Sequence, residues 1–184
     1  MSLTPSNMLP LGTVAPDFKL LDPRDGQLKT LSELKGAQGT LIMFVCNHCP
    51  FVVHIESAMA DLGREYADKA INFVAISAND VIAYPQDSPE KMAQKATELD
   101  YRFPYLYDES QETARAYQAA CTPDFFLFDG ELRCVYRGRF DGSTPGNGVA
   151  VTGSDIKAAL NALESNQPIE QKQYPSMGCN IKWR

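Results

Sequence analysis

The stretch FVCNHCPF, residues 44–51, sets two cysteines, Cys46 and Cys49, two residues apart, with Pro50 directly after them. The run that leads into it, TLIMFVC, is apolar and partly β-branched without alternation, which predicts a strand buried on both faces. After the second cysteine the apolar residues recur every three or four positions, which predicts one face of a helix. These residues are Val52, Ile55, Met59, Leu62 and Tyr66. Pro50 suits the first helical turn, where backbone N–H groups have no partner within the helix. The two thiols are therefore expected where a buried strand ends and a long helix begins.

Strands and helices alternate along the rest of the chain. The predicted strands are residues 71–77 and 103–108, with a hairpin over residues 124–138 around Asp129-Gly130. The predicted helices are residues 87–99, 110–120 and 152–165. A further hairpin around the turn DPRDG, residues 22–26, extends the fold at its N-terminal side. This pattern predicts an α/β fold with a central mixed β-sheet flanked by helices.

The length of 184 residues suits a single domain, residues 1–184. Residues 1–16 combine prolines and glycines with small polar residues, which predicts a loosely ordered lead-in. Residues 138–152 are rich in glycine, which predicts an exposed loop. The tail, residues 165–184, has little periodicity but ends MGCNIKW. That ending is too apolar for a tail that stays exposed to solvent, so we expect it to pack on the domain.

Composition limits the partners and the compartment. The net charge of −6, without clusters of Lys and Arg, argues against nucleic acid. The longest apolar run, residues 41–45, is too short to span a bilayer, and no secretory leader opens the chain. The cysteine count of five is odd, which does not suit a domain held together by disulfides. Thiols that stay reduced or cycle fit better, so we expect a cytoplasmic protein.

A helix N-terminus carries unpaired N–H groups and about half a positive charge, which favours a thiolate over a thiol. We expect Cys46, at the mouth of the helix, to be the exposed nucleophile. Cys49, more shielded in the first turn, is expected to attack a mixed disulfide that Cys46 has formed. His48 lies between them and would stabilise the thiolate further. Glu56, two turns along the helix, is a candidate base for the proton of Cys49.

Two other uses of the thiol pair remain open, a static disulfide and a metal site. Zinc usually takes four ligands, and the residues that could complete such a site are His54, Cys121, Cys134 and Cys179. Thiolates also select Cu(I). Cys134, on a predicted hairpin strand, is expected to be a small buried apolar residue. Cys121 and Cys179 are candidates for an additional redox thiol.

The strand–Cys-x-x-Cys–helix unit, followed downstream by CTPDFFLFDG, resembles the thioredoxin superfamily. In that superfamily a cis-proline lies against the Cys-x-x-Cys pair, and the residues at this turn bind the backbone of the substrate. Thr122 and Pro123 match that position, which implies a substrate-binding role for them. The chain is also similar to the peroxiredoxin-like redoxin (AhpC/TSA-type) group with a Cys-x-x-Cys motif. The segments that carry this similarity are the opening APDF, then LKG and YRGRFDG, and the tail SMGCNIKW. The resemblance covers nearly the whole chain and implies a thioredoxin-like fold.

Several positions depart from the patterns of related groups. Peroxiredoxins have a proline seven residues before, and a threonine or serine three residues before, the peroxidatic cysteine, where this chain has Gly39 and Met43. Thioredoxins have a tryptophan before the first cysteine, where this chain has Val45. The position of His48 is similar to that in the strongly oxidising disulfide-forming proteins, which also have a histidine there.

These observations predict a thiol–disulfide oxidoreductase that exchanges disulfides with protein or small-molecule thiols, with an electron donor that the sequence does not identify. The first alternative is a thiol peroxidase that reduces hydroperoxides through Cys46, with Cys49 or Cys179 resolving. The second alternative is a copper- or zinc-binding module that uses Cys46, Cys49 and a histidine. For the leading prediction we expect no cofactor and no resident metal.

Overall fold

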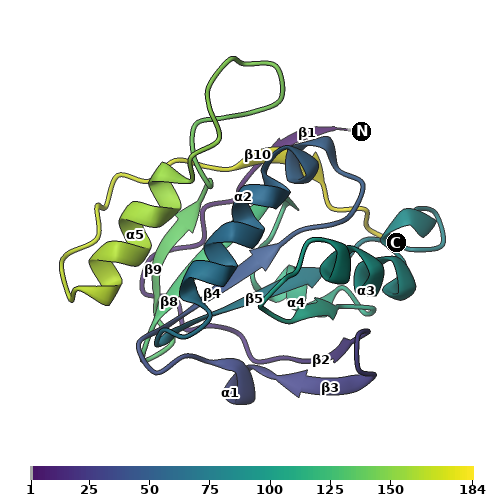
Figure 1. Cartoon of the computed structure of the whole chain (residues 1–184), viewed down its shortest axis with the longest axis horizontal. Coiled ribbons are helices and arrows are strands. Elements are labelled where there is room, and N and C mark those ends of the chain that lie inside the picture. The colour runs from purple at the N-terminus through teal and green to yellow at the C-terminus, as the bar shows by residue number, and fades with distance from the viewer. Residues whose placement is uncertain (1) are drawn as a thin grey trace.

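The computed structural model describes residues 2–184 and shows a mixed seven-stranded sheet in the order β3-β2-β6-β5-β4-β8-β9 (Figure 1). Its strands are β2 (Lys19–Asp22), β3 (Gln27–Thr30), β4 (Gly39–Phe44), β5 (Ile71–Ser77), β6 (Tyr105–Tyr107), β8 (Asp124–Asp129) and β9 (Cys134–Gly138). A second, three-stranded sheet has the order β1-β10-β7 and comprises β1 (Leu3–Pro5), β7 (Cys121–Thr122) and β10 (Met177–Asn180). The helices are α1 (Leu31–Leu34), α2 (Pro50–Tyr66), α3 (Pro89–Glu98), α4 (Glu112–Ala116) and α5 (Ser154–Glu164), with a 3-10 turn η1 (Pro85–Asp87). The predicted α/β class with a central mixed sheet is confirmed.

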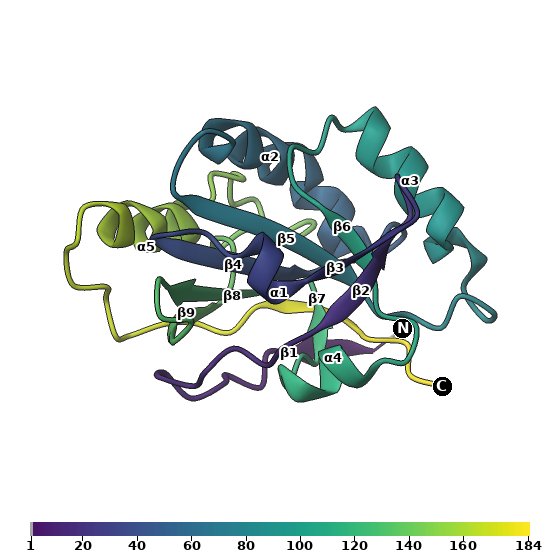
Figure 2. The same cartoon turned by 90° about the horizontal axis from the view of Figure 1, so that it is seen from below.

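Strand β4 is buried along all six of its residues, as its unbroken apolar run predicts. It pairs in parallel with β5 and antiparallel with β8. Leu41 and Met43 face a core layer formed with α2, α3 and α5, while Ile42 and Phe44 face the opposite layer, which includes α4. Figure 2 shows α2 and α3 on one face of the sheet and α4 on the other. Because β4 is covered on both sides, its end is fixed by two core layers.

Helix α2 begins where the change of period predicts. Cys49 is its N-cap residue and Pro50 is the first helical residue. All five apolar residues that define the predicted face are buried. The side chains of Val52 and Ile55 bury this face against the sheet, so packing as well as propensity determines where the helix starts.

Both predicted hairpins are present, as the pairs β2–β3 and β8–β9. Helix α4 is shorter than the predicted residues 110–120. Gln111 before it and Gln118 after it both have positive φ angles, 65° and 55°. Side chains rarely adopt this left-handed conformation, and a regular helix cannot pass through it.

The two ends of the chain lie side by side. The lead-in, expected to be loosely ordered, is held by β1, which pairs with β10, and by Leu9, which is buried in the core. The tail supplies β10, which lies between β1 and β7. These pairings join segments from opposite ends of the chain, and no local pattern in the sequence signals them.

The glycine-rich segment 138–152 is exposed only in part. It projects from the body of the molecule (Figure 1), and residues 145–150 are exposed. The two ends of the segment are held together by the buried Asp141. Its carboxylate accepts hydrogen bonds from the backbone N–H groups of Ser143, Thr152 and Gly153.

Among residues 2–184, no helix has both the length and the apolar character needed to cross a bilayer.

Substitution of Gly178 tests how closely β10 packs on β7. A Cβ atom at this position would overlap the carbonyl oxygen of Thr122, whereas one on Gly142 would meet nothing closer than 3.8 Å. We expect Gly178→Ala to lower the free energy of unfolding by about 1–3 kcal/mol through overpacking. Gly142→Ala should change it by no more than roughly 0.5 kcal/mol. Urea unfolding of both variants measures the difference, and equal stabilities would contradict the observed packing.

Candidate active site

Cys46 and Cys49 flank the turn between β4 and α2, as predicted. Cys46 is 3% exposed and Cys49 is fully buried. The expectation that Cys46 is exposed is therefore wrong, although it is the more accessible of the two thiols. Its sulfur is covered by the segment around Thr122, whose hydroxyl lies 3.6 Å from Cys46 Sγ. The pair is thus a buried one that a substrate reaches only through a narrow opening or a local movement.

The peptide bond between Thr122 and Pro123 is cis, as the resemblance implies. The antiparallel register of β4 and β8 pairs Phe44 with Asp124, so the cis turn lies beside the residues that follow β4. The Thr122 carbonyl oxygen accepts a hydrogen bond from Cys49 Sγ at 3.3 Å. The two segments, far apart in sequence, are held together by the central strands of the sheet.

The hydrogen bond between the two thiols shifts their pKa values in opposite directions. A hydrogen bond from the Cys46 thiol, together with one from Cys179 and the backbone N–H of Val52, lowers the pKa of Cys49 to about 4. The pKa of Cys46 is raised well above its usual value, first by its hydrogen bond to Cys49, then by burial and by the negative charge of Asp87. The Thr122 hydroxyl acts in the opposite direction. At neutral pH the pair therefore holds one thiolate at the start of α2.

The partly buried His48 and the fully buried Asp87 form a pair next to Cys46. His48 Nδ1 lies 2.6 Å from Asp87 Oδ2. The imidazole stacks on the ring of Tyr84, with the two ring centroids 5.4 Å apart. His48 Nε2 is buried and has no hydrogen-bond partner within residues 2–184. Because its other nitrogen is held by Asp87, the ring is fixed in orientation beside the thiols.

Asp87 was not identified from the sequence as a site residue, because it is the first residue of the predicted helix 87–99. Its side chain is fully buried and accepts hydrogen bonds from the backbone N–H of Asn47 at 2.8 Å and from Asn79 Nδ2 at 2.8 Å. Asn47 Oδ1 in turn accepts from the hydroxyl of Tyr105 at 2.9 Å. The Asp87 carboxylate therefore fixes the conformation of the turn between the two cysteines.

Glu56, the candidate base from the sequence, does not join this network. Its carboxylate pairs with Lys95 Nζ at 2.8 Å. His54 is partly buried along α2 and is likewise not among the residues grouped around Cys46. Asp87 is the carboxylate that the fold places beside the thiols.

The donor atoms of Cys46, His48 and Asp87 lie within 4.8 Å of one another, a spacing compatible with a metal ion. The metal alternative from the sequence combined both cysteines with a histidine, whereas the structure groups only one of them with His48. The side-chain oxygens of Asp87 already accept three hydrogen bonds. This arrangement fits a hydrogen-bonded His–Asp pair more closely than a set of open ligands.

The other three cysteines have different surroundings. Cys134 is buried in β9, as predicted, and burial raises its pKa to about 11. Cys121 is fully buried in β7, and burial together with the charge of Asp124 raises its pKa further. Cys179 lies in β10 directly opposite Thr122, and its thiol is hydrogen-bonded to Cys49. Of these three, Cys179 is therefore the one in direct contact with the Cys-x-x-Cys pair.

Strand β10 lies beside the residues that the resemblance implies for substrate binding. The backbone of Thr122 was expected to bind an incoming chain, but in this structure it pairs with Cys179 of β10. Ser176 Oγ also donates a hydrogen bond to the carbonyl oxygen of Pro123. The edge next to the cis-proline is thus occupied by the protein's own C-terminal strand.

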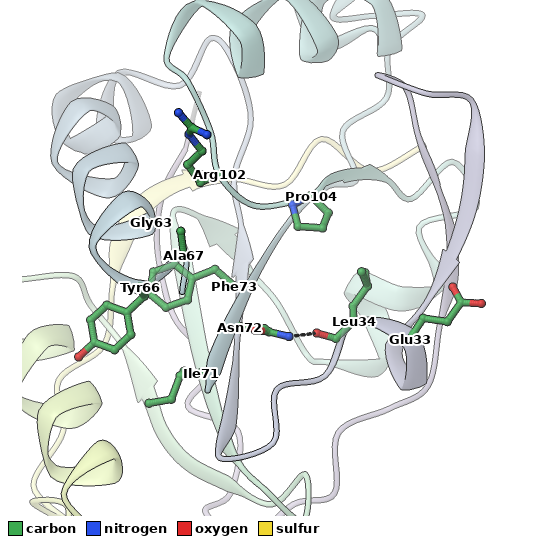
Figure 3. A pocket seen from close by; sticks show the side chains of 10 residues that line it. All are labelled: Glu33, Leu34, Gly63, Tyr66, Ala67, Ile71, Asn72, Phe73, Arg102 and Pro104. Atoms are coloured by element: carbon green, nitrogen blue, oxygen red, sulfur yellow. Dashed lines mark hydrogen bonds between the residues drawn. The ribbon is translucent and has the colours of Figure 1, made fainter. Parts of the chain in front are cut away.

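A hollow of about 190 Å³ lies on the accessible side of Pro123. Its walls include Phe51 and Ile55 of α2, Phe140 and Met177. A second hollow, of about 140 Å³, is lined by Tyr66, Asn72 and Arg102 among others, and Asn72 donates to the carbonyl oxygen of Leu34 within it (Figure 3). It lies at the C-terminal end of α2, about 25 Å along the helix from Cys49 at 1.5 Å per residue, so it is not part of the thiol site.

Asp124 is a fully buried carboxyl group next to the cis-proline. Its Oδ1 accepts a hydrogen bond from Ser6 Oγ at 2.7 Å, while Oδ2 has no partner within residues 2–184. Burial raises its pKa from 3.8 to about 7. Since the folded state holds this proton more tightly than the unfolded state does, Asp124 favours folding below pH 4 and costs stability as the pH rises to 7.

Asp124→Asn removes this titration and keeps an acceptor for Ser6. We expect the free energy of unfolding of the wild type to fall, relative to that of the variant, between about pH 4 and pH 7, by about 1.4 kcal/mol per pKa unit of difference. Urea unfolding of both proteins across this range measures the difference. Parallel pH profiles would show that the carboxyl is not protonated in the folded protein.

Comparisons with known proteins agree with this architecture. A profile of the AhpC/TSA family matches residues 11–137. An uncharacterized conserved protein from Geobacillus kaustophilus is 53% identical, with 100% of this chain and 97% of that chain covered and a TM-score of 0.98. A hypothetical protein from Sinorhizobium meliloti 1021 is 48% identical, with 98% of each chain covered and a TM-score of 0.96.

A more distant solved structure shares the fold. A secreted disulfide oxidoreductase from Mycobacterium tuberculosis is 14% identical, with 79% of this chain and 95% of that chain covered and a TM-score of 0.60. At this identity the likeness concerns the fold alone. A search of curated proteins gave no match.

Proposed function

This chain belongs to the AhpC/TSA family of thioredoxin-like redoxins, and we propose that it acts as a thiol–disulfide oxidoreductase through Cys46 and Cys49. The observation that carries the proposal is the contact of three features: the paired thiols, the N-terminus of α2 and the cis-Pro123 turn. The helix stabilises a thiolate there, and the fold keeps the second sulfur within reach of the first. A static disulfide or a purely apolar role would not need a shared proton between the two thiols.

In the proposed reaction Cys46 Sγ attacks one sulfur of a substrate disulfide. A bond forms between these two sulfurs, the substrate S–S bond breaks, and the other substrate sulfur leaves as a thiolate that takes up a proton. Cys49 Sγ then attacks Cys46 Sγ, which releases the second substrate thiolate and leaves a Cys46–Cys49 disulfide. In the reverse direction this disulfide oxidises a substrate dithiol.

The shared proton fits this order of events. The negative charge rests mainly on Cys49 in the resting pair, since its pKa is about 4, while the proton stays on Cys46. Attack by Cys46 requires that its proton move to Cys49, and the hydrogen bond between the two thiols supplies the path. Cys46 is the one to attack because it is the more accessible sulfur and because Cys49 is fully buried.

The hollow beside Pro123 supports an approach from the side of α2. Its lining is mixed, with apolar Phe51 and Ile55 and polar Arg139 among others, and suits a substrate segment that has both apolar and polar groups. His48 and Asp87 fix the turn that carries Cys46 and so act as positioning residues. The substrates in this account are disulfide-bearing or dithiol-bearing proteins and small molecules.

The assignment of the two cysteines is tested with Cys46→Ser and Cys49→Ser in an insulin-reduction assay with dithiothreitol. We expect Cys46→Ser to lose roughly a thousandfold or more of the activity, because the attacking sulfur is gone. Cys49→Ser should trap a stable mixed disulfide on Cys46, visible by mass spectrometry. Cys134→Ser, which removes a buried thiol outside the site, serves as the control. Full activity of Cys46→Ser would overturn the assignment.

Thiol peroxidase activity is the second candidate, and one contact favours it. The Thr122 hydroxyl lies 3.6 Å from Cys46 Sγ and could bind a peroxide oxygen. Against it, the positions seven and three residues before Cys46 hold Gly39 and Met43, both buried in β4 and without a hydroxyl.

Stopped-flow mixing of the reduced protein with hydrogen peroxide separates the two candidates. The leading proposal predicts that Cys46 reacts no faster than an ordinary thiolate, because the residue three positions before it, Met43, has no hydroxyl to donate to a peroxide. A much faster reaction that is lost in both Cys46→Ser and Thr122→Val would instead establish the peroxidase.

A further inference from the structure

Strand β10 lies on the edge where a substrate chain is expected to bind. It pairs antiparallel with β7, with Cys179 opposite Thr122 and Asn180 opposite Cys121. Its other edge pairs with β1, so it is held from both sides. The approach is close, because Gly178 leaves no room for a Cβ atom next to the Thr122 carbonyl. The C-terminal strand therefore occupies this edge in the way that an extended substrate would.

This arrangement places a third sulfur at the start of α2. Cys179 is 2% exposed, and its thiol is hydrogen-bonded to Cys49. The backbone N–H of Phe51, in the first turn of α2, also faces its sulfur. Cys46, Cys49 and Cys179 belong to one buried cluster. Cys49 thus has a thiol partner on each side, one within the motif and one from the tail.

We propose that β10 is an internal occupant of the substrate edge and that Cys179 is a third redox thiol, which exchanges with the oxidised pair by attacking Cys49. The proposal rests on the thiol–disulfide activity above, which supplies the Cys46–Cys49 disulfide. Cys179 Sγ forms a bond with Cys49 Sγ, the Cys46–Cys49 bond breaks, and the proton of the Cys179 thiol passes to the departing Cys46 sulfur. The number of disulfides is unchanged, so the step needs no additional oxidant.

The state of the pair controls when this step can occur. In the reduced protein, burial and the neighbouring Cys49 raise the pKa of Cys179 to about 12, so it stays protonated. Once Cys49 is part of a disulfide, it carries no negative charge. Its charge then no longer raises the pKa of Cys179. The Phe51 N–H remains to stabilise the Cys179 thiolate. The exchange returns Cys46 as a free thiol, while the disulfide moves to the buried Cys49–Cys179 position.

The test maps disulfides in the full chain after oxidation with glutathione disulfide, acid quenching, alkylation and peptide mass spectrometry. We expect the wild type and Cys134→Ser to contain both the Cys46–Cys49 and the Cys49–Cys179 disulfide. Cys179→Ser should contain only the first. Cys46→Ser, which keeps Cys179 and β10 intact, should form Cys49–Cys179 roughly tenfold faster or more when folded than when unfolded in urea.

The outcomes separate this proposal from the proposed function. If the folded Cys46→Ser variant forms no Cys49–Cys179 disulfide faster than the unfolded chain does, the third-thiol proposal is wrong, whatever the wild type does. If the wild type forms no Cys46–Cys49 disulfide while the variant forms Cys49–Cys179, the thiols of the tail and the helix react but the proposed function is wrong.

Discussion

The site depends on the antiparallel pairing of β4 with β8 at the centre of the sheet. The register that sets Phe44 opposite Asp124 places the cis turn before β8 against the turn after β4. From this one alignment follow the contacts of Thr122 with both sulfurs. A slip of one residue would reverse which side chains of β8 face each core layer, so the buried sheet strongly favours this register. The strands that form the core therefore also set the geometry of the thiols.

The electrostatics of the site combine opposing influences. The N-terminus of α2 stabilises a thiolate on the pair, while the buried Asp87 carboxylate opposes a charge on Cys46. Asp87 is held in place by Asn79 and by the backbone of Asn47, so its charge cannot move away from the thiols. The result is a hydrogen bond between the two thiols that lowers the pKa of Cys49 and raises that of Cys46.

Much of the fold was predictable from the sequence because it follows from local patterns. The unbroken apolar run of β4 and the three-and-four spacing after Cys49 predict the strand, the helix and the position of the thiols between them. The cis bond at Pro123 was implied only by the resemblance, since no spacing in the chain reveals which segment faces the motif. The burial of Cys46 was missed because it results from a segment some 76 residues away.

Other features have no local signal at all. Asp87 lies 39 residues from His48 and resembles an ordinary residue before a helix. The pairing of β10 with β7 joins a tail that has no periodicity to a strand of two residues. Both depend on long-range hydrogen bonds, which a single sequence does not display. For this reason no pattern in the sequence indicates that β10 lies along the edge where a substrate was expected.

The central claim is that Cys46 and Cys49 form a working redox couple rather than a static pair. Its most direct measurement is the reduction potential of the pair, from equilibration with mixtures of reduced and oxidised glutathione and alkylation of the remaining thiols. The account predicts a reversible two-electron transition between about −270 and −120 mV. Thiols that stay reduced throughout, or a disulfide that persists below about −300 mV, would contradict it.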